Sequence, residues 1–161
     1  MTTEQALKDY LASRGMIPRE LPRSEWYREN WVRVAMWGRR VPVFPVYGFK
    51  ESLFIHDIHH LLSGYDTDWT GELEIAAWEL SSGGCGRYFL YWMDRIVFTI
   101  LGLIFAPRAT CRAFRRGRRH QNIFRRDPEE VMSTEIDELR RMTLSPKSPS
   151  EGPQVHGPSR A

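Results

Sequence analysis

The chain has 161 residues, enough to bury one hydrophobic core, and its 42% content of hydrophobic residues argues against a wholly disordered protein. Its net charge of +3 is unevenly distributed, with acidic residues and no Lys or Arg over 51–82, and arginines and no acid over 107–126. The acidic block is suited to binding cations, and the basic block to binding phosphates or carboxylates.

Cysteine content and the amino-terminal sequence bear on the cellular compartment. Cys85 and Cys111 are the only cysteines, too few for a disulfide framework, so we expect two reduced thiols. The amino-terminal segment contains Glu4 and Asp9 and has no apolar run typical of a secretory signal. We therefore expect a cytoplasmic protein.

Apolar residues at helical spacing predict an all-α fold of about five to seven helices. Residues 4–14 form the first expected helix, with Gly15 at its carboxyl end. Ser24 is a plausible cap for a second helix, and Pro42 and Pro45 favour an extended segment after it. The helices expected after the first cover residues 24–37, 51–62, 69–82, 87–106, 108–119 and 128–142.

The last expected helix opens with Asp127 as its cap and Pro128 in its first turn, and it carries Leu139 and Met142 on its apolar face. No convincing strand is evident, and the Pro- and Ser-rich tail is expected to be disordered. The expected domain organisation is an amino-terminal helix and linker (1–22), a helical domain (23–142), for which the residues discussed below predict metal and lipid binding, and the tail (143–161).

A cluster of histidines marks the expected helix over residues 51–62. His56 and His60 are four residues apart and therefore lie on one helix face, with Asp57 beside them. Glu72 arrives from the start of the next helix, after a turn able to fold back. Two imidazoles and two carboxylates form a complete ligand set for zinc or a similar divalent ion. The alternative is an ordinary surface histidine pair, and His59, which points away from His60, is expected at the surface or behind the ligands.

The spacing His56-Asp57-x-x-His60, eleven residues, then Glu72 resembles the signature of the coenzyme Q (ubiquinone) biosynthesis protein 4 family. Gly71 matches the glycine that precedes the family's glutamate. The segment AFRRGRRHQNIFRRDPEEVMSTEIDELRRM is similar to the family's basic helix, acidic turn and final Leu- and Arg-rich helix. The resemblance covers roughly residues 48–142 and is strongest at the histidine motif.

The resemblance implies a bacterial-type member of this family, with an all-α fold and peripheral placement on the inner face of the cell membrane. It implies a metal, zinc or alternatively iron, at His56, Asp57, His60 and Glu72, with Asp57 and Glu72 as the catalytic residues. The implied function is replacement of the C1 carboxyl of a polyprenylated benzoate by hydroxyl, organisation of the biosynthetic complex at the membrane, or both. Implied partners are a quinone precursor or other isoprenoid lipid, an anionic membrane surface, other ubiquinone-biosynthesis proteins and a second copy of the chain. A non-catalytic lipid-binding scaffold with a structural zinc and a small metallohydrolase unrelated to quinones are the alternatives.

An apolar run precedes the arginine-rich segment. Residues 96–106 carry no charge, but their roughly 16 Å of helix cannot span a hydrocarbon core of about 30 Å. The run is either a core helix or the wall of a lipid tunnel or membrane-docking face. The arginines after it either contact anionic headgroups or form a solvated face. No recognisable DNA-binding motif accompanies them, which argues against a nucleic-acid partner.

Overall fold

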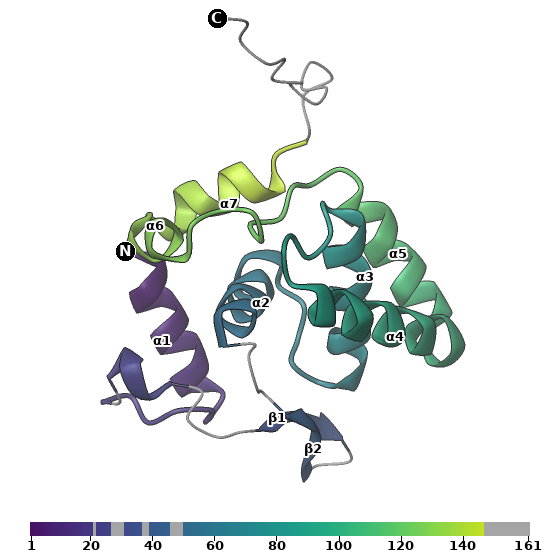
Figure 1. Cartoon of the computed structure of the whole chain (residues 1–161), viewed down its shortest axis with the longest axis horizontal. Coiled ribbons are helices and arrows are strands. Elements are labelled where there is room, and N and C mark those ends of the chain that lie inside the picture. Colours follow the sequence, from purple (N-terminus) through teal and green to yellow (C-terminus); the bar gives the residue numbers. More distant parts are fainter. Residues whose placement is uncertain (21, 27–30, 37–38, 46–49, 147–161) are drawn as a thin grey trace, which may run out of the picture.

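The computed structural model describes residues 1–20, 22–26, 31–36, 39–45 and 50–146. Within these residues the body of the protein is helical, as predicted, and a two-stranded hairpin lies at its edge (Figure 1). The elements in chain order are α1 (Thr3–Ser13), the short 3-10 helix η1 (Arg23–Glu25), β1 (Trp31–Met36), β2 (Arg39–Pro45), α2 (Lys50–Ser63), α3 (Trp69–Ser81), α4 (Phe89–Phe105), α5 (Pro107–Gly117), α6 (Pro128–Ser133) and α7 (Ile136–Leu144).

The first predicted helix is confirmed as α1. The Thr2 hydroxyl accepts a hydrogen bond from the backbone N–H of Gln5 and so caps its amino end. Gly15 follows the carboxyl end with a φ of 62°, a left-handed conformation that glycine adopts without steric cost. The apolar stripe of α1 is buried through Leu7 and Leu11, so this helix is part of the core.

The helix predicted for residues 24–37 is wrong. Residues 23–25 form η1, and β1 pairs antiparallel with β2, with Val34 opposite Val41. Apolar residues at helical spacing suggested a helix, but β1 is also rich in valine, which favours strands when a partner strand is available. The prolines of β2 exclude a helix there, as predicted, and leave an extended partner. Residues 27–30, 37–38 and 46–49 of these two predictions lie outside the described residues.

The single helix predicted for residues 128–142 is two helices, α6 and α7. The cap at Asp127 is confirmed, since its carboxylate accepts hydrogen bonds from the N–H groups of Glu129 and Glu130. Thr134 and Glu135 are extended because their backbone pairs with the amino terminus. The Thr134 carbonyl accepts from the N–H of Thr3 at 2.8 Å, and the N–H of Ile136 donates to the Met1 carbonyl at 3.1 Å.

The carboxyl-terminal boundary also differs from the prediction. Helix α7 continues to Leu144, so residues 143 and 144 are helical rather than part of a disordered tail. Residues 147–161 of the predicted tail lie outside the described residues. Leu139 is buried as predicted, whereas Met142 is exposed, because the break before α7 changes which of its faces meets the core.

The helices form two groups, and α2 of one group lies next to α3 of the other near the centre of the protein (Figure 1). Helix α1 packs on α2, α6 and α7, and α3 packs on α4 and α5. Glycine permits the closest of these approaches: a Cβ on Gly117 of α5 would lie 2.6 Å from the backbone oxygen of Trp78 in α3. The two groups enclose the space where α2, α3 and α4 meet.

We expect the two apolar residues of α7 to differ sharply in their effect on stability. Leu139→Ala removes a side chain that is 1% exposed, and we expect it to lower the free energy of unfolding by about 2–5 kcal/mol. Met142→Ala alters a side chain that is 42% exposed, and we expect a change within about 0.5 kcal/mol. Urea denaturation followed by circular dichroism measures both, and equal losses would contradict the observed orientation of α7.

Candidate metal centre

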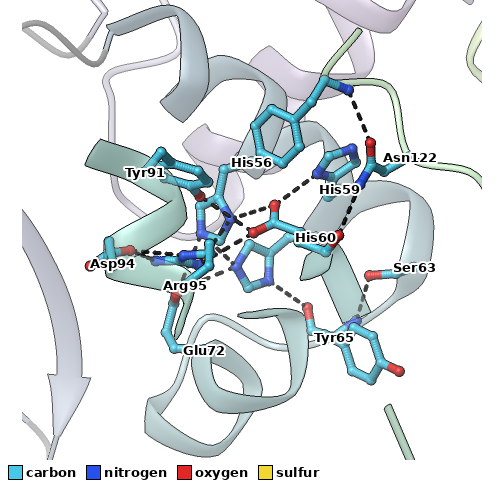
Figure 2. A network of polar contacts seen from close by, with 12 residues as sticks. His56, His59, His60, Ser63, Tyr65, Glu72, Tyr91, Asp94, Arg95 and Asn122 are labelled. Atoms are coloured by element: carbon cyan, nitrogen blue, oxygen red, sulfur yellow. Dashed lines mark hydrogen bonds and ion pairs between the residues drawn. The ribbon is translucent and has the colours of Figure 1, made fainter. Parts of the chain in front are cut away.

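A tight turn brings the start of α3 back onto α2. The carboxylate of Asp68 caps α3 by accepting from the N–H of Gly71 at 2.7 Å. A Cβ at Gly71 would lie 1.9 Å from the backbone oxygen of Asp66, so only glycine fits where the chain crosses itself. Glu72 follows immediately, and the turn therefore directs its side chain toward the histidines of α2 (Figure 2).

Three of the four ligands expected from the sequence converge at this point. The Nε2 atoms of His56 and His60 are 3.2 Å apart, and they lie 3.3 Å and 3.4 Å from the carboxylate oxygens of Glu72. Ligands bound tetrahedrally to zinc at about 2.0–2.1 Å are separated by about 3.3 Å, which is the spacing seen here. All three residues are buried, and among the described residues they are the one such group of histidine, cysteine or acidic side chains able to hold a metal ion.

Hydrogen bonds to Nδ1 of His56 and His60 determine that the Nε2 atoms, which face the centre, carry the lone pairs. The Nδ1 atom of His60 lies 3.0 Å from the backbone oxygen of Tyr65, which can only accept, so Nδ1 carries the hydrogen. His56 donates in the same way from Nδ1 to a carboxylate oxygen of Glu79 at 3.0 Å. In the neutral rings both Nε2 atoms are then acceptors. Two imidazole lone pairs and a carboxylate that face one another require either a proton or a metal ion between them.

The electrostatics of the centre agree with that requirement. Burial alone would lower the pKa of His56, but the carboxylates of Glu79 and Glu72 outweigh it and raise this pKa to about 10. Burial alone would raise the pKa of Glu72, but His60 and His56 outweigh it and hold this pKa well below its usual range. When no metal is bound, the centre therefore retains a proton on His56, and a metal ion competes with that proton.

Asp57, the fourth expected ligand and one of the two expected catalytic residues, does not join this group. It lies on α2 and is largely buried, but its carboxylate is not within the set of ligand atoms that are all within 4.8 Å of one another. Its charge acts instead on Tyr10 of α1, where burial raises the pKa to about 12, Arg14 opposes this rise and Asp57 adds to it.

Glu79 was not identified from the sequence as part of the site. It is fully buried, and one of its oxygens accepts from Nδ1 of His56 at 3.0 Å and from Nδ1 of His59 at 2.8 Å (Figure 2). His59 is thus in the interior behind the ligands rather than at the surface. A signal for Glu79 existed in the sequence, since a residue seven positions after Glu72 lies on the same helix face.

Arg95 supplies the buried positive charge that balances Glu79. It is 2% exposed, its NH1 atom lies 3.5 Å from the second oxygen of Glu79, and its Nε donates to Asp94 at 2.8 Å. Its guanidinium also lies 4.7 Å from the ring centroid of Tyr91. Burial raises the pKa of Glu79, but His56, His59 and Arg95 outweigh it and hold that pKa far below its usual range.

Comparisons of the chain with protein-family profiles, with curated proteins and with solved structures found no match.

We expect zinc binding to weaken as the pH falls, because the ion must displace the proton of His56. The raised pKa of His56 places this exchange below pH 10, so one proton is released per ion across the neutral range. The apparent dissociation constant is therefore expected to rise about tenfold for each unit between about pH 8 and pH 6. Titration against a chelator of known pH dependence measures it, and a constant affinity over this range would contradict the exchange.

Proposed function

We propose that the protein is a metal-dependent protein of ubiquinone biosynthesis that acts on the C1 position of a polyprenylated benzoate or organises the enzymes that do so. The observation that carries the proposal is the convergence of three buried groups, from His56, His60 and Glu72, which have no donor among them when both rings are neutral. These residues belong to the motif that resembles the coenzyme Q biosynthesis protein 4 family, and the helical body accords with that resemblance.

The donor set of two imidazole nitrogens and one carboxylate suits zinc and also iron. A divalent ion held by three protein ligands offers a further position where it can polarise a carboxylate or phenolate oxygen or lower the pKa of bound water. Asp57 lies on the same helix next to His56 and can serve as a base or as a further ligand. Replacing carboxyl by hydroxyl releases CO₂, adds an oxygen atom to the ring and removes two electrons, so the reaction needs an oxidant such as dioxygen with either ion. Zinc itself cannot take part in the electron transfer.

We expect loss of the metal ligands to abolish quinone production. In a bacterial strain that lacks its coenzyme Q biosynthesis protein 4 homologue, the wild-type chain is expected to restore ubiquinone, and His60→Ala and Glu72→Gln are expected to leave a carboxylated precursor in the lipid extract. Glu74→Gln is the matched control, because Glu74 lies on the same helix but pairs with Arg112.

Three results would contradict parts of this proposal. Failure of the wild type, with the protein present and metal-loaded, argues against a role in ubiquinone synthesis. Full restoration by metal-free Glu72→Gln argues that the ion does not take part in the chemistry. Restoration by Asp57→Asn would exclude a catalytic role for Asp57 and would leave the roles of the other three residues unaffected.

The peripheral placement in this proposal is supported by the two sides of α4. Its inward face is buried through Tyr91, Arg95, Phe98 and Gly102. Its other face exposes large apolar side chains, a surface that water does not favour. Those exposed residues are Phe89, Leu90, Met93, Ile96, Val97, Ile100, Leu103, Ile104 and Phe105. No helix in the described part of the chain has the length and hydropathy to cross a bilayer.

The arginines of α5 follow directly after this apolar face. Arg108, Arg112 and Arg115 line a groove of about 550 Å³ together with Pro107 and Cys111. Exposed apolar side chains next to exposed guanidinium groups match a bilayer surface, where acyl chains lie beside anionic headgroups. We therefore propose that the exposed residues of α4 and α5 contact an anionic membrane.

We expect the protein to sediment with phosphatidylcholine vesicles that contain about 30% phosphatidylglycerol, and to dissociate at high salt. The double variant Val97→Asp/Ile104→Asp is expected to bind at least about tenfold more weakly, because it places carboxylates on the apolar face. Met142→Asp, which alters an exposed apolar residue on α7, is the control and is expected to bind like the wild type. Equal binding by all three proteins would contradict the placement.

A further inference from the structure

The buried carboxylate of Glu79 accepts hydrogen bonds from two histidines, His56 at the candidate metal centre and His59 behind it. We propose that Glu79 is a positioning residue of the metal centre, which orients the imidazole of His56 with its Nε2 lone pair toward the ion. The inference rests on the proposed metal binding by His56, His60 and Glu72. It assigns to Glu79 a role that the ligand motif itself does not contain.

The contacts of Glu79 determine the hydrogen position on two rings. Its Oε1 atom accepts from Nδ1 of His56 at 3.0 Å and from Nδ1 of His59 at 2.8 Å. For His59 the direction is settled independently, because its Nε2 atom accepts from the backbone N–H of Ile123 at 3.2 Å. Neutral His59 must then donate from Nδ1, and Glu79 is the acceptor.

The backbone around Glu79 is held as firmly as its side chain. The amide nitrogen of Asn122 donates to the backbone oxygen of Glu79 at 3.0 Å and to that of Gly84 at 2.8 Å. His59 binds the same 122–123 segment through Ile123. A carboxylate fixed at both its main chain and its side chain can orient His56 without being drawn toward the metal itself.

The charge of Glu79, and not only its shape, is matched to its surroundings. Its second oxygen lies 3.5 Å from NH1 of Arg95 and 3.5 Å from the hydroxyl of Tyr91. A glutamine at this position can still accept from one histidine, but its amide NH₂ would then face the guanidinium of Arg95. A carboxylate that accepts from a ligating histidine also increases the basicity of the metal-binding nitrogen.

The direct test is zinc affinity of the full-length chain, measured by chelator competition for the wild type, Glu79→Gln and Glu74→Gln. Partners behind a ligating histidine typically change metal affinity by 10- to 100-fold, so we expect a loss of roughly this size in Glu79→Gln and no loss in Glu74→Gln. Cobalt(II) absorption provides a second readout, and we expect Glu79→Gln to shift the d–d bands because the field of the His56 nitrogen changes.

A measurement on the wild type keeps the inference testable if Glu79→Gln does not fold. Long-range ¹H–¹⁵N NMR of the zinc-loaded protein is expected to show His56 protonated at Nδ1 and bound through Nε2. Binding through Nδ1, or unchanged affinity and cobalt spectrum in folded Glu79→Gln, would overturn the positioning role while leaving the metal centre intact. Failure of the wild type to bind zinc would instead overturn the metal centre and this inference together.

Discussion

The arrangement of α2, α3 and α4 depends on one constraint, that charges buried between them must be compensated within the cluster. Glu79 contributes a fully buried carboxylate, and Arg95 a nearly buried guanidinium, at the meeting point of the three helices. An uncompensated charge at such a depth would cost several kcal/mol, so each of these charges is tolerated in the interior only beside its partner. This pairing ties α4 to α3 and, through the histidines, ties both helices to α2.

On the ligand side of the cluster, acceptor atoms face one another. Behind His56 and His60 every Nδ1 atom has an acceptor, whereas in front of them only lone pairs and the Glu72 carboxylate meet. A proton can lie between these acceptors, and so can a divalent ion at the observed spacing. The proposed metal chemistry thus follows from the balance of donors and acceptors, rather than from the presence of histidines alone.

Helix α4 contacts the buried cluster with one face and solvent with the other. Arg95 and Tyr91 on its inner face contact the buried cluster, and the opposite face exposes apolar side chains. The charged pair that interrupts the apolar run, Asp94 and Arg95, therefore belongs to the centre. The substrate proposed above, with a polar aromatic head and a long isoprenoid tail, would require polar and apolar environments close together, and α4 contributes to both.

The sequence by itself determined most of the helices and three converging candidate ligands, because helical periodicity, capping residues and the His-x-x-x-His spacing are local signals. Only the tertiary structure decided the hairpin, the break between α6 and α7, the exclusion of Asp57 from the ligand group and the role of Glu79. Each of these depends on a partner distant in the chain: β2 for β1, the amino terminus for Thr134, and the histidines and Arg95 for Glu79. Local patterns place a residue on a helix face, but the packing of other elements decides what that face meets.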